Sequence, residues 1–361
     1  MNRTRKKIKI IGVIGARPNF IKVAPLAKAI KKEKRINFVL VHTGQHYDFL
    51  MSEIFFKNLN IPKPDYNLNI GPGSQAWQIA KIMIALGKIC LKEKPDWVLA
   101  VGDVNSSLAA ALTAANLNIR LCHLEAGVRS FDLNMPEEIN RVLTDRVSSL
   151  FFCPTKTSVE NLKKEGIKKG VYNTGDIMYE AFLLNIKTAE GKSNILKVLN
   201  LKEKSYFLFT LHRPVNSDSP EALKNIIEAV AESGEKIIFP CHPRTEKQIK
   251  KAKIRIPENL KIIKPVGYLD MLKLEKNSKK IITDSGGVQR EAFWLKIPCI
   301  TLRNSTEWPE TVENKWNVLA GSDKSKITEA IENFEPGSPQ KSYFGGGETS
   351  KKIIEILLSE K

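Results

Sequence analysis

Carboxylates and basic side chains gather in the stretch HLEAGVRSFDLNMPEEINRVLTD, residues 123–145. It begins inside the apolar run IRLCHL, which is typical of a buried strand, so Glu125 is expected at a strand end. Glu137 and Glu138 follow Met-Pro in the first turn of an expected helix, where the helix dipole alone favours one carboxylate. Arg141 can pair with Glu137 on the same helix face. Carboxylates brought to one substrate can donate and accept protons, but these residues alone do not decide between Glu137 and Glu138.

Three other strand ends in the first half carry polar side chains. GARPNFIK (15–22) places Arg17 at the start of a helix, where an anion can bind. Gln45 and His46 in TGQHYD could contact a ligand, although this motif is weak by itself. Asp103 in GDVNSS could be catalytic, or could belong to an ordinary turn and helix cap.

The second half offers a phosphate-binding pattern. The apolar run YFLFTL is followed by His212, which could transfer a proton or bind phosphate, or could simply cap a helix. His242 follows the next apolar run in a similar position. In DSGGVQREA (284–292), Ser285 and two glycines open a helix with bare backbone N–H groups, which suit a pyrophosphate. Glu291 in that helix could bridge two ribose hydroxyls.

The candidate side chains must be positioned by the secondary structure. The sequence shows short apolar runs that alternate with longer helical patterns. Such runs are typical of parallel strands covered on both faces. The runs are IKIIGVI (8–14), NFVLVH (37–42), WVLAV (97–101), IRLCHL (119–124), SLFFC (149–153), YFLFTL (206–211), KIIFP (236–240), LKII (260–263), KKIIT (279–283) and PCITL (298–302).

The alternation restarts after a lysine-rich helical passage, so we predict an α/β fold of two Rossmann-like, doubly wound domains facing each other across a cleft. We expect an N-terminal domain over 1–185 and a C-terminal domain over 186–345, followed by a helix over 346–361 that packs back on the first. Ligands of open parallel sheets bind beyond the carboxyl ends of the strands. All the candidates occupy that position.

The composition is that of a globular protein, with 361 residues, 42% hydrophobic and 27% charged. The net charge of +18 invites a nucleic-acid partner. However, the excess is lysine spread over expected helix faces, and no basic-aromatic binding motif is present, so we expect no nucleic-acid partner. The five cysteines form no CxxC and are expected to be buried free thiols. No run approaches a membrane span, so we expect a cytoplasmic protein without membrane attachment.

No sequence pattern requires a cofactor or a metal. The dinucleotide fingerprint G-x-G-x-x-G does not follow the first strand, and neither a Walker A motif nor a cluster with metal-ligand spacing occurs. We therefore expect no cofactor and no metal site.

The motifs GARPNFIK, TGQHYD, GD, HLEAGVRS, MPEEINR, HR, TDSGGVQREA and TEWPE occur in this order over nearly the whole chain. This series resembles the non-hydrolysing UDP-N-acetylglucosamine 2-epimerases. The resemblance implies a GT-B fold, a homodimer and a role in surface polysaccharide biosynthesis. It also implies interconversion of UDP-GlcNAc and UDP-ManNAc, by elimination of UDP to a 2-acetamidoglucal and re-addition with inversion at C2. A UDP-sugar glycosyltransferase and a hydrolysing 2-epimerase of the same fold remain alternatives.

The resemblance also implies roles for individual residues. The implied catalytic residues are Asp103, Glu125, Glu137 and His212. The implied contacts to the nucleotide sugar are Arg17, Lys22, Arg141, Arg213, Val266, Met271, Ser285, Gly286, Gly287 and Glu291. The candidates for an effector or secondary contact are Gln45, His46 and His242.

Three positions depart from the pattern of the family. HRPVN lacks the carboxylate that usually follows the HR pair, Trp308 replaces an arginine that usually contacts the nucleotide, and Met271 replaces an aromatic residue near the uracil. These departures bear on how UDP is bound.

Overall fold

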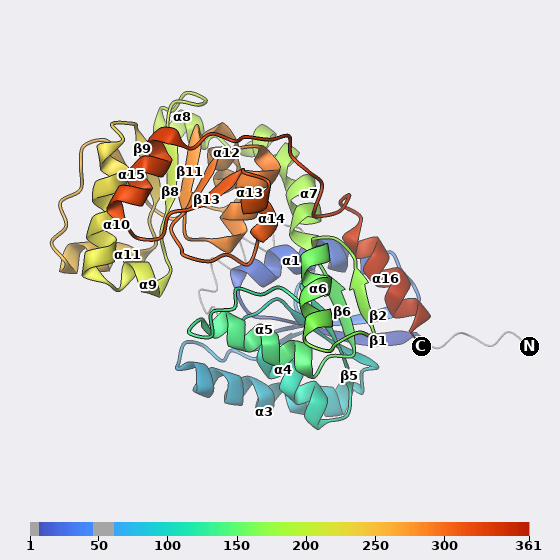
Figure 1. The fold of residues 1–361 in the computed structure, drawn as a ribbon. Coiled ribbons are helices and arrows are strands. Elements are labelled where there is room, and N and C mark those ends of the chain that lie inside the picture. Colours follow the sequence, from blue (N-terminus) through green and yellow to red (C-terminus); the bar gives the residue numbers. More distant parts are fainter. Residues whose placement is uncertain (1–6, 46–60, 361) are drawn as a thin grey trace, which may run out of the picture. The chain divides into compact units, whose positions relative to one another are not determined.

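The computed structural model describes residues 7–45 and 61–360, apart from the side chain of Arg17 (Figure 1). His46 lies outside the described residues. The chain divides into two compact units: unit 1 comprises Met1–Leu183 and Ser342–Lys361, and unit 2 comprises Leu184–Lys341.

Among its described residues, unit 1 contains a seven-stranded parallel sheet with the order β3-β2-β1-β4-β5-β6-β7. The order reverses between β1 and β4, and such a switch point is where open α/β sheets bind ligands. The strands are β1 (Ile8–Ile14), β2 (Ile36–His42), β3 (Tyr66–Asn67), β4 (Trp97–Val101), β5 (Arg120–Leu124), β6 (Leu150–Cys153) and β7 (Val171–Asn173). The helices are α1 (Arg17–Ile30), α3 (Gln75–Glu93), α4 (Asn105–Asn116), α5 (Pro136–Arg146), α6 (Lys156–Lys164) and α16 (Thr349–Ser359), and α7 (Ile177–Lys192) runs on into unit 2.

The described residues of unit 2 form a six-stranded parallel sheet with the order β10-β9-β8-β11-β12-β13, which reverses between β8 and β11. The strands are β8 (Phe207–Thr210), β9 (Ile237–Pro240), β10 (Leu260–Ile263), β11 (Lys280–Thr283), β12 (Cys299–Thr301) and β13 (Asn317–Leu319). The helices are α8 (Ile195–Leu199), α9 (Pro214–Ser217), α10 (Pro220–Glu232), α11 (Pro243–Lys251), α12 (Tyr268–Asn277), α13 (Gly286–Leu295), α14 (Pro309–Glu313) and α15 (Lys324–Asn333).

Apolar side chains cover both faces of the second sheet. Phe207 and Phe209 of β8 belong to one buried cluster, whereas Tyr206 and Leu208 belong to another. Alternate residues of a strand point to opposite faces, so a strand packed on both sides needs a continuous apolar run. The prediction of an α/β fold with parallel sheets covered by helices is therefore confirmed.

The last helix belongs to unit 1. α16, red in Figure 1, packs against α1. The Tyr172 hydroxyl donates to a Glu360 carboxylate oxygen at 2.7 Å, and the backbone N–H of Ser350 donates to Glu180 at 2.7 Å. All five cysteines are free and buried, as predicted. No helix in the described part of the chain is both long and apolar enough to cross a membrane.

Candidate functional site

The carboxyl ends of β1 and β4 are joined closely. Asn19 on α1 donates through Nδ2 to the Val101 carbonyl at 2.8 Å, and its Oδ1 accepts from the Ala16 N–H at 3.1 Å. Gly15 lies against the side chains of Thr43 and Ser106, so that a Cβ there would collide with both hydroxyls. The turn after β1 is therefore held against the start of α4.

Gln45 lies in this junction. Its Oε1 accepts hydrogen bonds from the N–H of Ser106 at 3.1 Å and from the Ser106 hydroxyl at 2.7 Å. These bonds satisfy a donor in the first turn of α4, which is the role of a helix cap. These bonds therefore give Gln45 a structural role, because it ties the loop after β2 to the start of α4.

A buried ion pair lies at the centre of unit 1. The Lys22 Nζ donates to Oε2 of Glu125, and each side chain is only 5% exposed. Gly102, with φ 63°, lies beneath the pair: a Cβ there would be 2.7 Å from the Lys22 Nζ and 3.6 Å from Glu125 Oε2. Glu125 itself has φ 75°, which is unusual for a residue with a side chain and costs energy. Such strained positions concentrate at functional sites.

A second ion pair involves the residue after Gly102. An Arg141 N–H donates to Oδ2 of Asp103, whose side chain is 25% exposed. Asn140, also on α5, donates to the Asp103 carbonyl at 2.9 Å. Thus α5 holds both the backbone and the carboxylate of Asp103.

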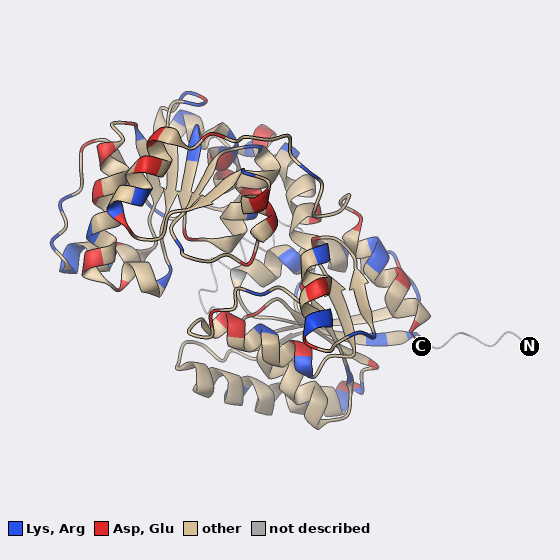
Figure 2. Ribbon diagram, viewed as in Figure 1, with Lys and Arg blue, Asp and Glu red and all other residues tan. Residues whose placement is uncertain are grey.

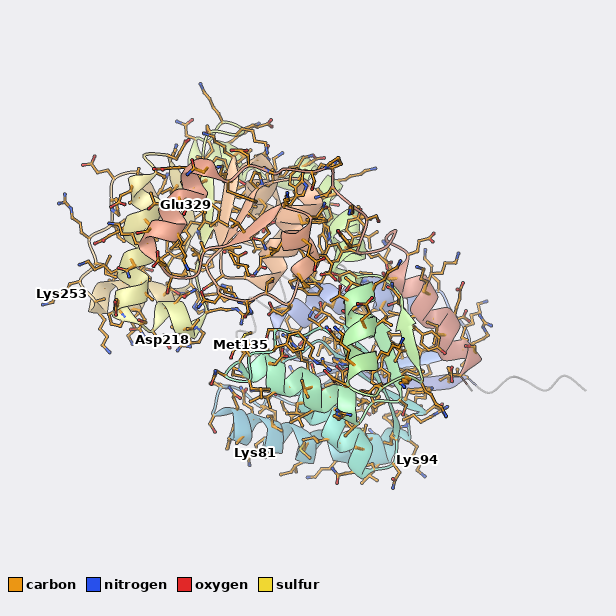
Figure 3. All side chains as sticks on the ribbon, in the orientation of Figure 1. Lys81, Lys94, Met135, Asp218, Lys253 and Glu329 are labelled. Atoms are coloured by element: carbon orange, nitrogen blue, oxygen red, sulfur yellow. The ribbon has the colours of Figure 1, made fainter. Side chains whose placement is uncertain are left out.

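The structure separates the two adjacent glutamates of α5. Glu138 is buried and accepts from the N–H and hydroxyl of Ser130, from the Phe131 N–H and from Arg141, at 2.8–3.0 Å. This carboxylate therefore fixes the loop that leads to Met135, labelled in Figure 3. Glu137 is only partly buried, so the geometry leaves it as the better candidate for proton transfer.

Pattern reasoning did not single out one cluster behind these carboxylates. His123 and Asp145 are fully buried and bonded at 2.7 Å. Arg129 lies 2.7 Å from Asp145 and donates through Nε to Glu165 at 2.7 Å. The apolar neighbours of His123 along β5 were the available signal, because a histidine inside an apolar strand needs buried partners.

In unit 2, Asp284 organises the end of β8. This buried carboxylate accepts from the N–H groups of His212 (3.1 Å) and Arg213 (2.9 Å) at the start of α9. The His212 Nδ1 lies 3.4 Å from Asp284 Oδ1, and half of the His212 side chain is exposed. Arg213 donates through Nε to the Asp284 carbonyl at 3.0 Å and reaches Glu307 at 3.2 Å. Asp284 belongs to the DSGG motif but was not among the predicted site residues.

We expect Asp284→Ala to lower the free energy of unfolding by about 2 kcal/mol, because it leaves two backbone donors uncapped. Asp284→Asn keeps one acceptor oxygen and should lose less. Chemical denaturation of the two variants and the wild type measures the difference, with Asp323→Ala, a cap of the distant helix α15, as the matched control. If Asp284→Ala is no worse than Asp284→Asn, the carboxylate does not organise this turn.

The start of α13 is capped by a serine side chain and carries two glycines in its first turn. Ser285 is the N-cap, and its Oγ accepts from the Val288 N–H at 3.4 Å. Ser285, Gly286 and Gly287 are partly exposed. At Gly286 a Cβ would be 3.3 Å from the Trp308 Nε1, so this position has room for little more than backbone. The first N–H groups of a helix have no partner within it and attract phosphate.

Trp308 packs against the first turns of α13. It is buried, and the Arg290 guanidinium lies 3.9 Å from the centre of its ring, a cation–π arrangement. Trp308, which replaces the usual arginine of the family pattern, therefore stacks against Arg290 inside unit 2.

Glu291 lies in an acidic, buried environment. Burial, followed by the charge and hydrogen bond of Glu291, raises the pKa of Glu275 well above its ordinary value. Burial and the same two glutamates also raise the pKa of Tyr268. Met271 and Val266 are partly buried against the adjoining apolar cluster.

His242 occupies the N-cap position of α11. Its Nδ1 accepts from the Arg244 N–H at 3.2 Å, and the residue is exposed. Among residues 7–45 and 61–360, no group of three or more His, Cys, Asp or Glu side chains is arranged to hold a metal ion.

Comparisons with known proteins agree over nearly the whole chain. A family model described as UDP-N-acetylglucosamine 2-epimerase matches residues 28–358. A Methanococcus maripaludis UDP-N-acetylglucosamine 2-epimerase homolog is 54% identical over 97% of this chain and 99% of its own length. A Pseudomonas aeruginosa UDP-2,3-diacetamido-2,3-dideoxy-D-glucuronate 2-epimerase is 41% identical, covering 97% and 99%. The crystal structure of Methanocaldococcus jannaschii UDP-GlcNAc 2-epimerase with UDP-GlcNAc and UDP has a TM-score of 0.92 at 46% identity, covering 98% of this chain and 100% of that one.

Proposed function

Since the chain belongs to the UDP-N-acetylglucosamine 2-epimerase family, we propose that it interconverts UDP-GlcNAc and UDP-ManNAc without hydrolysing them. The observation that carries this proposal is the pair of carboxylates around Gly102. Glu125 is held by Lys22, and Asp103 is held by Arg141, at the switch point of the first sheet. Cationic partners favour the ionised form that accepts a proton.

Epimerisation at C2 poses a particular chemical problem. The carbon has no adjacent carbonyl, so its proton is not acidic. Anti or syn loss of that proton together with the C1–O bond to UDP gives a 2-acetamidoglucal and free UDP. Protonation of the glucal at C2 from the other face, with return of UDP to C1, gives the epimer. The carbon skeleton keeps its oxidation state, and the proton lost at C2 is replaced by another.

The described residues suit these steps. Two or more proton-handling groups are needed, because removal and return occur on opposite faces. We assign Asp103, Glu125 and Glu137 to proton transfer and to stabilisation of positive charge at C1. The helix start at Ser285, Gly286 and Gly287 would hold the diphosphate.

The remaining assignments concern the nucleotide. His212, oriented by Asp284, would act next to the diphosphate together with Arg213. Glu291 would bind the ribose, while Val266 and Met271 would line the uracil side. The five buried, free cysteines fit our proposal of a cytoplasmic location.

Incubation with UDP-GlcNAc alone distinguishes the proposed reaction from its alternatives. UDP-ManNAc should accumulate to a constant ratio with UDP-GlcNAc, whichever of the two is supplied. Free ManNAc and UDP as main products would identify a hydrolysing enzyme. No change without an added acceptor would favour a glycosyltransferase.

One relative motivates a second substrate. The Pseudomonas aeruginosa protein is named for a uronate with two acetamido groups, and it covers the same length of this chain. The same C2 chemistry applies to both sugars. Parallel assays with UDP-GlcNAc and UDP-2,3-diacetamido-2,3-dideoxy-D-glucuronate should show a higher kcat/KM for UDP-GlcNAc, and the reverse order would reassign the substrate.

We also propose that the protein is a homodimer through the outer face of α3 and α5. Trp77, Ile84 and Leu91 are 42–64% exposed and follow a seven-residue spacing, which puts them on one face of α3. Ile139 and Leu143 on α5 are also exposed, and α4 packs between the two helices. In Figure 2 the visible face of α3 is largely uncharged, and Figure 3 labels Lys81 on this helix and Lys94 just after its end. Exposed apolar patches of this kind mark interfaces.

We expect Ile84→Glu combined with Leu91→Glu to weaken self-association by at least about 100-fold, because charges would be buried without partners. Sedimentation velocity over a concentration series measures the change. Val198→Glu is the matched control, since Val198 on α8 is 75% exposed and lies outside the proposed interface. A dimer that survives the double substitution would place the interface elsewhere.

A further inference from the structure

A fully buried histidine lies behind the carboxylates of unit 1. His123 is on β5, two residues before Glu125, and its side chain has no exposed surface. Its Nδ1 lies 2.7 Å from Oδ1 of Asp145, and its Nε2 lies 2.9 Å from the carbonyl oxygen of Gly102. Both ring nitrogens therefore face oxygen atoms that are hydrogen-bond acceptors.

Asp145 is held in its charged form. Its Oδ2 accepts from the N–H of Gly127 at 3.1 Å and lies 2.7 Å from the Arg129 NH1. Burial alone would raise the pKa of Asp145, but His123 and Arg129 hold it below its ordinary value. Arg129 and the Gly127 N–H favour the carboxylate form whatever the charge of His123. A charged carboxylate has no proton to donate, so the Nδ1 of His123 must be the donor.

The second ring nitrogen is constrained in the same way. A peptide carbonyl can only accept, so the Nε2 of His123 must donate to Gly102. A ring that donates from both nitrogens is an imidazolium.

The charges of the cluster support the same protonation state. Arg129 is bonded at 2.7 Å to Glu165 as well as lying against Asp145. With a charged His123, two buried cations face the buried Asp145 and the partly exposed Glu165, whereas a neutral ring would leave Arg129 alone against both carboxylates. The neighbouring Cys153 contributes no charge, because burial raises the pKa of its thiol. An uncompensated buried charge is costly, so the balanced state is favoured.

Gly102 connects the His123 ring to the two carboxylates, Asp103 and Glu125. Its N–H donates to the Leu124 carbonyl at 2.9 Å, while its carbonyl accepts from His123. The Lys22–Glu125 pair lies over its Cα, and the next residue is Asp103. Gly102, the residue before Asp103, is thus fixed to β5 by two bonds. The bond from a charged His123 would be charge-assisted and therefore stronger than a neutral bond.

We propose that His123 is a buried imidazolium, balanced by Asp145, and that its bond to the Gly102 carbonyl positions Asp103 and Glu125 for proton transfer. His123 touches no substrate in this scheme; it is a positioning residue. The second half of the proposal rests on the proposed epimerase function, whereas the charge of the ring does not.

Nitrogen-15 NMR of the histidine rings tests the charge directly. The chain has five histidines, and His123→Gln assigns the signal by removing it. Near neutral pH, both nitrogens of His123 should carry a proton, with each proton coupled to its own nitrogen. A ring with one bare nitrogen would overturn the proposal. In Asp145→Asn the Nδ1 loses its anionic acceptor, and the ring should become neutral; if that variant does not fold, the wild-type spectrum still decides.

Kinetics test the positioning. We expect His123→Gln and Asp145→Asn each to lower kcat by at least about 100-fold, while UDP affinity, which depends on unit 2, changes by less than about three-fold. If His123 and Asp145 had a purely structural role, the variants would give less folded protein. The protein that does fold would then keep both its kcat and its UDP affinity. Unchanged kcat in both variants would overturn the positioning role. If the wild type does not epimerise at all, the proposed function fails, while the spectrum still decides the charge of His123.

Discussion

Glu125→Gln is expected to lower kcat by about 1,000-fold, because a glutamine cannot accept the C2 proton and general acid–base groups contribute on this scale. The substitution is nearly isosteric and keeps the unusual φ of 75° at this position. UDP affinity should change by less than about two-fold, since the diphosphate helix is in the other unit. Initial rates with UDP-GlcNAc and calorimetric titration with UDP measure the two effects separately.

Stability provides an internal check on this result. Removing the charge of Glu125 leaves Lys22 buried without its partner, which should lower the free energy of unfolding by about 3 kcal/mol. Lys22→Met combined with Glu125→Gln removes both charges and should recover most of that loss without recovering activity. Glu160→Gln, at an exposed position of α6, is the matched control and should match the wild type in rate and stability. Near-normal kcat in Glu125→Gln would exclude Glu125 from proton transfer.

Gly102→Ala should have the next largest effect on activity and stability. It has two causes, backbone strain and a steric clash with Lys22, which can be measured separately. The backbone at Gly102 has φ 63°, and a Cβ would lie 2.7 Å from the Lys22 Nζ. Gly166 has φ 85° with nothing within 4 Å of its Cβ position, so Gly166→Ala carries the conformational cost alone. That cost is about 1–2 kcal/mol.

We expect Gly102→Ala to exceed Gly166→Ala in destabilisation and to lower kcat by at least about 100-fold, because the new methyl group displaces the Lys22–Glu125 pair. Gly166→Ala should leave kcat unchanged. Denaturation curves and initial rates of the two variants give the comparison. Equal destabilisation together with normal kcat in Gly102→Ala would mean that the pair tolerates displacement and does not depend on this glycine.

The fold could be predicted because its long strands are buried on both faces. Runs such as WVLAV and YFLFTL are almost entirely apolar, and each contains a central strand of a parallel sheet. The short strands β3, β7 and β13 were not among the predicted runs. They have two or three residues, include exposed or polar positions and lie at or near sheet edges, so they have no periodicity to detect.

The candidate site could be predicted in position but not in its partners. Asp103, Glu125 and His212 all follow strands, as the apolar runs indicated. The separate roles of Glu137 and Glu138 could not be derived, because they depend on where the loop at Ser130 returns. Local pattern gives the place of a side chain along an element, whereas hydrogen-bond partners depend on the tertiary path.

The same limit applied to the two organising carboxylates. Asp284 follows a strand and precedes a glycine-rich turn, so pattern reasoning attributed the motif to the diphosphate alone. Its bonds run to the N–H groups of His212 and Arg213, more than 70 residues earlier in the chain. His123 and Asp145 meet across 22 residues of loop and helix. Neither contact follows from helical or strand periodicity.

The most direct test of the proposed reaction is solvent exchange at C2. The protein is incubated in D₂O with UDP-GlcNAc, and both nucleotide sugars are examined by proton NMR before equilibrium is reached. Elimination and re-addition require the C2 proton to be lost, so deuterium is expected at C2 of every UDP-ManNAc molecule formed. UDP-ManNAc that keeps its C2 proton would contradict the account.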